Sequence, residues 1–330
     1  MTGLKLTSLF FLFFLESCNS QEKIENKMTT DERLSKISEK IKKYDSEPLY
    51  QIKVKTQNCY QILVNDFPVY TYFDKMSGKI GLNINSAILK SGIQTLQIKI
   101  YPSYNSQNIQ NEYLTNKDFF SLEIEQTSWN KNGHLEKPET ILKYELPMYK
   151  MDSDDEPDYS QPIDYSQQNQ LTKNFTFQAK VPYELKGWSE SEDLSKMDQE
   201  VLREKVLKFC ENLINNYKDE NFDYVKTKYL KADIEWYQSE YLKPDVIKKY
   251  QNAMNANKGK FKNTFIPLSK YKLPIHGNNK IISIERSDIE NKGKSIFLYE
   301  KTDNEGNKKI IALDLYLHIP KGSKELEIIR

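Results

Sequence analysis

Residues 50–55 read Tyr-Gln-Ile-Lys-Val-Lys, and residues 96–101 read Leu-Gln-Ile-Lys-Ile-Tyr. Apolar and polar side chains alternate in both stretches, which is the pattern of a β-strand with one buried face. Further candidate strands lie at 60–64, 68–72, 80–84, 119–124 and 175–179. Turn signals such as Ser91-Gly92 separate several of them. Short strands separated by turns predict an antiparallel β-sandwich over residues 48–187.

One stretch of this region has a fold-level resemblance. The run from Ile84-Asn85 through Leu89 and Ser91-Gly92 to Leu96-Gln97-Ile98 is similar to the bend before a late strand in immunoglobulin-like domains. The resemblance implies an immunoglobulin-like sandwich. It implies no activity, because a fold by itself does not specify function.

After Trp188 the apolar residues recur at helical spacing. Two stripes are Leu202, Val206, Phe209, Leu213 and Tyr217, and then Phe222, Val225, Tyr229, Ala232 and Trp236. Pro244 fits the first turn of a third helix. Strand patterns follow at 281–286, 295–299 and 310–319. Helices followed by strands predict an α+β domain over 188–330. A nuclear-transport-factor-2-like cone of helices on a curved sheet is one form of it that no motif specifies.

Composition excludes several classes of protein. The 330 residues include 48 Lys and Arg against 47 Asp and Glu, so charge gives no reason to expect a nucleic-acid partner. A mean hydropathy of −0.74 excludes a protein with many membrane spans. Three cysteines exclude a disulfide-dense scaffold. Cys59 and Cys210 are interpreted as small core residues, with a disulfide between them as the alternative.

The amino terminus has the order of an export signal. Lys5 precedes an apolar stretch at 6–15, and Leu15-Glu16-Ser17-Cys18 follows. As a helix the apolar stretch spans about 15 Å, half of the bilayer core, which suits a cleaved signal better than a membrane anchor.

The tetrapeptide Leu15-Glu16-Ser17-Cys18 resembles the lipobox of bacterial lipoproteins, although Glu16 departs from the small or apolar residue usual there. The resemblance implies that residues 1–17 are a signal peptide and that Cys18 carries the acyl chains of a membrane anchor. Asn19 in place of Asp favours the outer membrane, by analogy with the sorting rule of enteric bacteria. We therefore expect a lipid-anchored protein of the bacterial envelope. An ordinary secreted protein with a chance cysteine near its cleavage site is the alternative.

Residues 18–47 are predicted to form the tether, with one short helix near 30–44. Thr29 and Glu32 have the spacing of a capping box. Apolar residues follow at helical spacing, with Ile37 and Ile41 among them. We expect this helix to end near Pro48.

An acidic segment at 151–172 interrupts the predicted sandwich. It holds six carboxylates and no Lys or Arg, and Asp158-Tyr-Ser-Gln161 recurs as Asp164-Tyr-Ser-Gln167. This composition predicts a solvated loop. We expect the loop to bind a partner through Asp154, Asp155, Glu156, Asp158, Tyr159, Asp164 and Tyr165. A solvated insertion without function is the alternative.

Motifs for catalysis or metal binding are missing from the sequence. His134, His276 and His318 occur outside any known metalloprotease or hydrolase pattern. Asp314 and His318 share a strand face, but four residues place them about 13 Å apart, beyond hydrogen-bond reach. An EF-hand is excluded because Pro157 and Ile163 occupy the positions of its glycine and glutamate. No catalytic residue, metal ligand or cofactor is therefore predicted.

Two classes of function remain. The first is a non-catalytic protein-binding module, such as an immunity protein held in the envelope against a delivered toxin. Such a protein needs an export signal and a complementary surface, which is often acidic. The second is a glycan-binding lipoprotein, or one that processes glycans through a pair of carboxylates.

Overall fold

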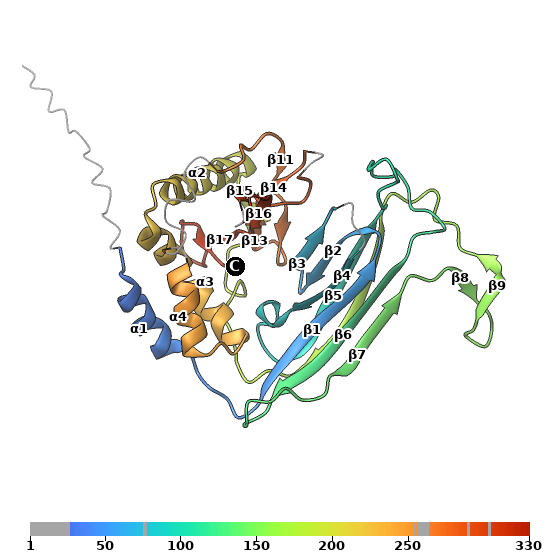
Figure 1. Ribbon diagram of the computed structural model, residues 1–330, viewed down its shortest axis with the longest axis horizontal. Helices are drawn as coiled ribbons and strands as arrows, with labels where there is room; N and C mark the ends of the chain where they lie inside the picture. Colours follow the sequence, from blue (N-terminus) through green and yellow to red (C-terminus); the bar gives the residue numbers. More distant parts are fainter. Residues whose placement is uncertain (1–26, 75–77, 254, 256–263, 289–290, 303–304) are drawn as a thin grey trace, which may run out of the picture.

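The computed structural model describes residues 27–330 except 75–77, 254, 256–263, 289–290 and 303–304 (Figure 1). The predicted signal peptide and Cys18 lie outside the described residues. The described chain is mostly β, with antiparallel sheets and four α-helices. Among these residues no helix is long and apolar enough to cross a membrane.

Two antiparallel sheets of four strands form the N-terminal part. The first has the order β4 (Gly78–Asn83), β1 (Glu47–Thr56), β6 (Phe120–Trp129) and β7 (Glu139–Glu145). The second has the order β10 (Leu171–Ala179), β5 (Gly92–Tyr101), β2 (Cys59–Val64) and β3 (Phe67–Tyr72). A 3₁₀ turn, Asn85–Ala87, lies between β4 and β5.

The alternating patterns decide which faces of these sheets are buried. Ile52 and Val54 of β1 are buried while Lys53 between them is exposed. Ile52 of the first sheet and Ile98 of the second belong to one hydrophobic core. The seven strands predicted in this region are confirmed. Strand β7 was not predicted, because as an edge strand it has no buried residue to mark it.

The acidic segment is not a plain loop, contrary to the prediction. Strands β8 (Tyr149–Met151) and β9 (Pro157–Pro162) pair as an antiparallel hairpin, which projects from the two sheets in Figure 1. Asp152 Oδ1 accepts hydrogen bonds from the backbone N–H groups of Asp154 and Glu156, at 2.9 and 3.0 Å. These bonds hold the turn between β8 and β9 in place, so Asp152 stabilises the hairpin.

Four helices form one layer beside the sheets. They are α1 (Thr30–Lys40), α2 (Gln199–Lys218), α3 (Phe222–Ser239) and α4 (Pro244–Ala253). The capping box of Thr29 and Glu32 is confirmed. Ile37 is buried against residues of α3 and α4, so α1 belongs to the folded body and not to the tether. The 3₁₀ turn Leu194–Lys196 precedes α2, which Asp198 caps.

Short strands complete the C-terminal part. A four-stranded sheet has the order β12 (Ile275–His276), β13 (Ile281–Ser283), β17 (Tyr316–His318) and β18 (Glu327–Ile328). Two pairs add β11 (Tyr271–Lys272) with β14 (Glu285–Arg286) and β15 (Phe297–Thr302) with β16 (Lys308–Leu313). These strands and the inner faces of α2 and α3 share a second core.

Two further predictions, one for the last strands and one for the cysteines, have clear outcomes. The single strand predicted at 310–319 is wrong, because the chain breaks at Asp314-Leu315 and its halves join different sheets. Cys59 and Cys210 are confirmed as buried residues, and both are free thiols.

Candidate functional site

The predicted contact residues mostly gather on the β8–β9 hairpin. Asp154, Asp155 and Glu156 lie at its exposed turn, and Tyr159 of β9 is 75% exposed. Asp158 Oδ1 accepts hydrogen bonds from the Ser160 side chain and backbone, which lower the pKa of Asp158. The hairpin therefore presents a negative surface that is mostly exposed.

The second copy of the acidic repeat has a different position. Asp164 is exposed, and its carboxylate accepts a hydrogen bond from the backbone N–H of Ser166, which lowers the pKa of Asp164. Tyr165 is only 4% exposed and lies in the core of the N-terminal sheets. Its hydroxyl donates to the Pro147 carbonyl at 2.6 Å. Tyr165 is thus a core residue, and the prediction that it contacts a partner is wrong.

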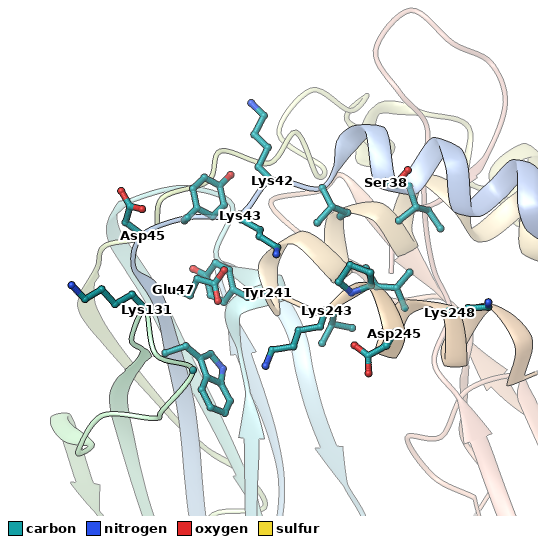
Figure 2. Close-up of a pocket in the computed structure, with 18 of the residues that line it drawn as sticks. Ser38, Lys42, Lys43, Asp45, Glu47, Lys131, Tyr241, Lys243, Asp245 and Lys248 are labelled. Carbon is teal, nitrogen blue, oxygen red and sulfur yellow. The ribbon is translucent and has the colours of Figure 1, made fainter.

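A large groove lies elsewhere, between the helices and the N-terminal sheets. Its volume is about 1170 Å³. Three chain segments line it: the C-terminal half of α1 with residues 41–47, the turn 129–133 after β6, and residues 241–248 at the start of α4 (Figure 2). We call this site the groove. Because its walls come from separate elements, it exists only when α1 is docked.

The floor of the groove is apolar. Ile37 and Ile247 are 1% and 4% exposed and belong to the small core between α1, α3 and α4. Leu34, Ile41 and Leu242 pack against that core and remain partly accessible. An accessible apolar floor of this kind is typical of a binding site.

Trp129 supplies the largest exposed side chain of the groove. It ends β6 and is 38% exposed. The turn that follows is held by Asn130, whose Oδ1 accepts hydrogen bonds from the N–H groups of Asn132 and His134. Gly133 has φ +76°, a conformation that side chains other than glycine rarely adopt. The indole is therefore presented by a rigid turn.

Tyr44 and Tyr241 add two more aromatic rings to the lining of the groove. Their rings make an edge-to-face contact with centroids 6.4 Å apart. Tyr241 follows α3 with φ 52°, and this backbone conformation turns its ring inward. Its hydroxyl is buried and has no hydrogen-bond partner in the described part of the chain. An unpaired buried hydroxyl is energetically costly.

Charges surround the opening of the groove. Five lysines line it, Lys42, Lys43, Lys131, Lys243 and Lys248, together with the acids Asp45, Glu47 and Asp245. Figure 2 shows the labelled lysines spread around the site. Burial raises the pKa of Glu47, and the neighbouring Lys243 and Lys43 offset part of that rise. The groove is therefore an apolar floor with a net positive rim.

The histidines do not form a reactive centre of the kind considered from the sequence. His318 Nδ1 lies 2.7 Å from the Ser191 hydroxyl, and burial lowers the pKa of His318 to about 4. Ser191 and His318 are each 7% exposed, so the pair is largely buried. His276 lies 3.6 Å from Glu285 in another buried pair. Within the described residues no cluster of His, Cys, Asp or Glu is arranged to hold a metal ion.

Comparisons with family models, curated proteins and solved structures found no match to this chain. The function must therefore be argued from the site itself.

The sequence analysis missed every residue of the groove. One signal was available: Trp129 follows the strand predicted at 119–124 by five residues and precedes Asn130-Lys-Asn-Gly133, a turn sequence that exposes its neighbours. No local pattern could show that Tyr44 meets Tyr241, because almost two hundred residues separate them in the chain.

Proposed function

We propose that this chain is a lipid-anchored protein of the bacterial envelope, held in the outer membrane through Cys18, and that its body is a non-catalytic protein-binding module. An immunity protein against a delivered toxin is the most specific form of this proposal. The groove is the observation that carries it, because its apolar floor and exposed Trp129 are built like a contact site.

The chemistry of the groove selects the kind of segment that it binds. A floor of several aliphatic side chains suits the apolar face of an amphipathic helix from a partner. Five lysines against three acids at the rim favour acidic residues on that helix. We therefore propose that the groove binds an acidic amphipathic segment, with Trp129 as the anchor.

The β8–β9 hairpin is a second proposed contact. Asp154, Asp155, Glu156, Asp158 and Asp164 give it a negative field, and Tyr159 adds exposed aromatic area. Exposed charges act mainly on the rate of association. We propose that the groove anchors a partner and that the hairpin steers a basic patch of the same partner.

The finer description of the fold is also a proposal. Two antiparallel sheets whose inner faces share one core support an immunoglobulin-like sandwich for residues 48–187. For residues 188–330 we propose only an α+β domain. Strands of two or three residues in its largest sheet give no support to a nuclear-transport-factor-2-like cone.

The groove is tested with a defined probe. A fluorescently labelled synthetic helix with Leu on one face and Glu on the other is titrated into residues 19–330, and its charge-reversed Lys counterpart serves as the control peptide. We expect the acidic helix to bind more tightly, and Trp129→Ala to weaken it by about tenfold or more. Tyr159→Ala is the matched variant, since it removes an exposed aromatic ring outside the groove.

Three outcomes would contradict this proposal. The groove is not the anchor if Trp129→Ala and Tyr159→Ala have equal effects. Its charge plays no part if both peptides bind alike. Binding of neutral oligosaccharides through Trp129 in place of the helix would favour the glycan-binding alternative, because aromatic rings also stack on sugars.

The anchor is tested separately. Metabolic labelling with a clickable fatty acid should mark the wild-type protein and leave Cys18→Ala unmarked. Equal labelling of both proteins would show that Cys18 is not the acylated residue.

A further inference from the structure

A second cleft, of about 300 Å³, lies between the N-terminal sheets and the C-terminal part. Tyr70 and Tyr72 of the edge strand β3 form one side. Ser283, Glu285, Asp314 and Tyr316 form the other. Figure 1 shows β3 facing the C-terminal strands across this boundary. We call this site the interdomain cleft.

Strand alternation explains why these polar side chains face the cleft. Ile282, Ile284, Leu315 and Leu317 belong to the core beneath α2 and α3. Successive side chains of an extended chain point to opposite sides, so the residues between them point away from that core. Ser283 and Tyr316 are also directly opposite each other in the β13–β17 pairing and share one face. The side chains of Ser283 and Tyr316 are therefore aimed toward β3.

The buried hydroxyl of Ser283 has no hydrogen-bond partner in the described part of the chain. Ser283 is 4% exposed. Buried hydroxyl groups are nearly always paired, because losing water without a replacement is costly. A ligand atom in the interdomain cleft would supply that partner.

Asp314 brings a carboxylate to the lining of the interdomain cleft. Its carboxylate is accessible from the cleft and forms no ion pair within the described part of the chain. Surrounding protein atoms displace some of its water and raise its pKa, and the negative charge of Glu285 adds to that rise. Glu285, in contrast, is paired with Lys272 at 2.9 Å. Of Glu285 and Asp314, only Asp314 has no ion pair in the described part of the chain; a third acid, Asp74, also lines the cleft.

Two lysines also line the interdomain cleft. Lys292 donates a hydrogen bond to Gln110 Oε1 at 3.0 Å, and its Nζ lies 4.6 Å from the centre of the Phe73 ring, which also lines the cleft. Lys294 is the other.

Tyr70 and Tyr72 are nearly parallel, with an interplanar angle of 13° and ring centroids 6.4 Å apart. Aromatic faces of this kind attract cations.

We propose that the interdomain cleft binds the protonated primary amine of a ligand. Asp314 supplies the opposite charge, the Ser283 hydroxyl accepts a hydrogen bond from the ammonium group, and Tyr70 and Tyr72 provide the aromatic wall. The amine belongs either to a small diamine or to a lysine side chain of a protein. This site is separate from the groove, and the proposal does not depend on what the groove binds.

Calorimetric titration of residues 19–330 at a fixed ionic strength tests the proposal. The probes are cadaverine, which is a free diamine, Nα-acetyl-lysine N-methylamide, which imitates a lysine in a protein, and pentanol, which has no charge. We expect at least one amine to bind and pentanol not to bind. Asp314→Asn should weaken amine binding by about tenfold or more, because it removes the carboxylate that would pair with the ammonium group. Ser283→Ala should weaken it severalfold.

Asp31→Asn is the matched control, since it removes an exposed aspartate in the first turn of α1 that lines neither the interdomain cleft nor the groove, and it should leave the affinity unchanged. Thermal unfolding of each variant verifies that the fold persists. Binding of cadaverine alone assigns the site to a free amine, and binding of the lysine derivative alone assigns it to a protein. The proposal is overturned if neither amine binds, if pentanol binds as well, or if Asp314→Asn retains the full affinity. Trp129→Ala should not change amine binding, so failure of the groove proposal would be seen separately.

Discussion

The β8–β9 hairpin and the groove carry their charges in opposite ways. On the hairpin, the carboxylates of Asp152 and Asp158 bind the backbone of their own turns and remain surrounded by water. In the groove, lysines surround an apolar floor, and Glu47 is partly removed from water. The hairpin is continuous in sequence, whereas the groove combines three distant segments. A dense run of charge is therefore visible in a sequence, but an anchoring surface needs apolar area that only packing brings together.

The largest expected effect separates two tyrosines of the acidic repeat. Tyr165→Ala should lower the free energy of unfolding by about 3–5 kcal/mol, because it removes a large core side chain. Tyr159→Ala should change it by less than about 0.5 kcal/mol, because Tyr159 is exposed. Urea denaturation measures both. Similar losses for the two variants would show that the repeat has one structural role and not two.

The next largest effect concerns α1, which forms one wall of the groove. Arg33 is 1% exposed; its guanidinium donates to Gln251 Oε1 at 3.2 Å and pairs with Asp223 at 3.0 Å. Arg33→Ala should cost about 2–4 kcal/mol and abolish binding of the acidic helix, because buried partners lose their hydrogen bonds.

Arg203→Ala is the matched control, since Arg203 makes an exposed ion pair with Glu200. It should cost less than about 1 kcal/mol. Denaturant unfolding and peptide titration measure the two variants side by side. Retained peptide binding in Arg33→Ala would show that the groove does not need a docked α1.

A smaller effect is expected when the hairpin is neutralised. Changing Asp154, Asp155, Asp158 and Asp164 together to Asn should alter stability by less than about 0.5 kcal/mol. Association of a labelled hexalysine peptide should slow severalfold at low salt, and the difference should fade near physiological ionic strength. Stopped-flow measurements in an Asp314→Asn background keep the interdomain cleft out of the comparison. An unchanged rate at low salt would leave the hairpin without a steering role.

The smallest expected effect is a difference between the pKa shifts of Glu47 and Asp158. Burial raises the pKa of Glu47 in the groove, whereas hydrogen bonds from Ser160 lower the pKa of Asp158 on the hairpin. Glu47 therefore begins to oppose folding as the pH rises through its unfolded pKa, and the full effect is reached above its folded pKa. Asp158 supports folding above its unfolded pKa, and this support is lost as the pH falls through its folded pKa. Carboxyl carbon NMR, assigned with Glu47→Gln and Asp158→Asn, should show Glu47 above its ordinary value and Asp158 below. If the pKa of Glu47 is not raised, or that of Asp158 is not lowered, the groove and the hairpin do not surround their carboxylates in these two different ways.

Much of the secondary structure could be predicted because it depends on neighbouring residues. The alternation at 50–55 and 96–101 correctly indicates β1 and β5, and the spacing of Thr29 and Glu32 correctly indicates a capping box. The break at Asp314-Leu315 could not be predicted, since both halves carry the same strand pattern. It arises because β16 pairs with β15 while β17 pairs with β13.

The sequence by itself determined where most strands and helices lie, which faces of β1 and β5 are buried, and that 151–172 is strongly negative. Those properties follow from local periodicity and composition. Only the tertiary structure decided that Tyr165 is a core residue while Tyr159, within the same tetrapeptide, is exposed. It also brought Tyr44 to Tyr241, and Asp314 and Ser283 to Tyr70. The physical reason is that burial and concavity depend on contacts between segments far apart in the chain, which no local pattern records.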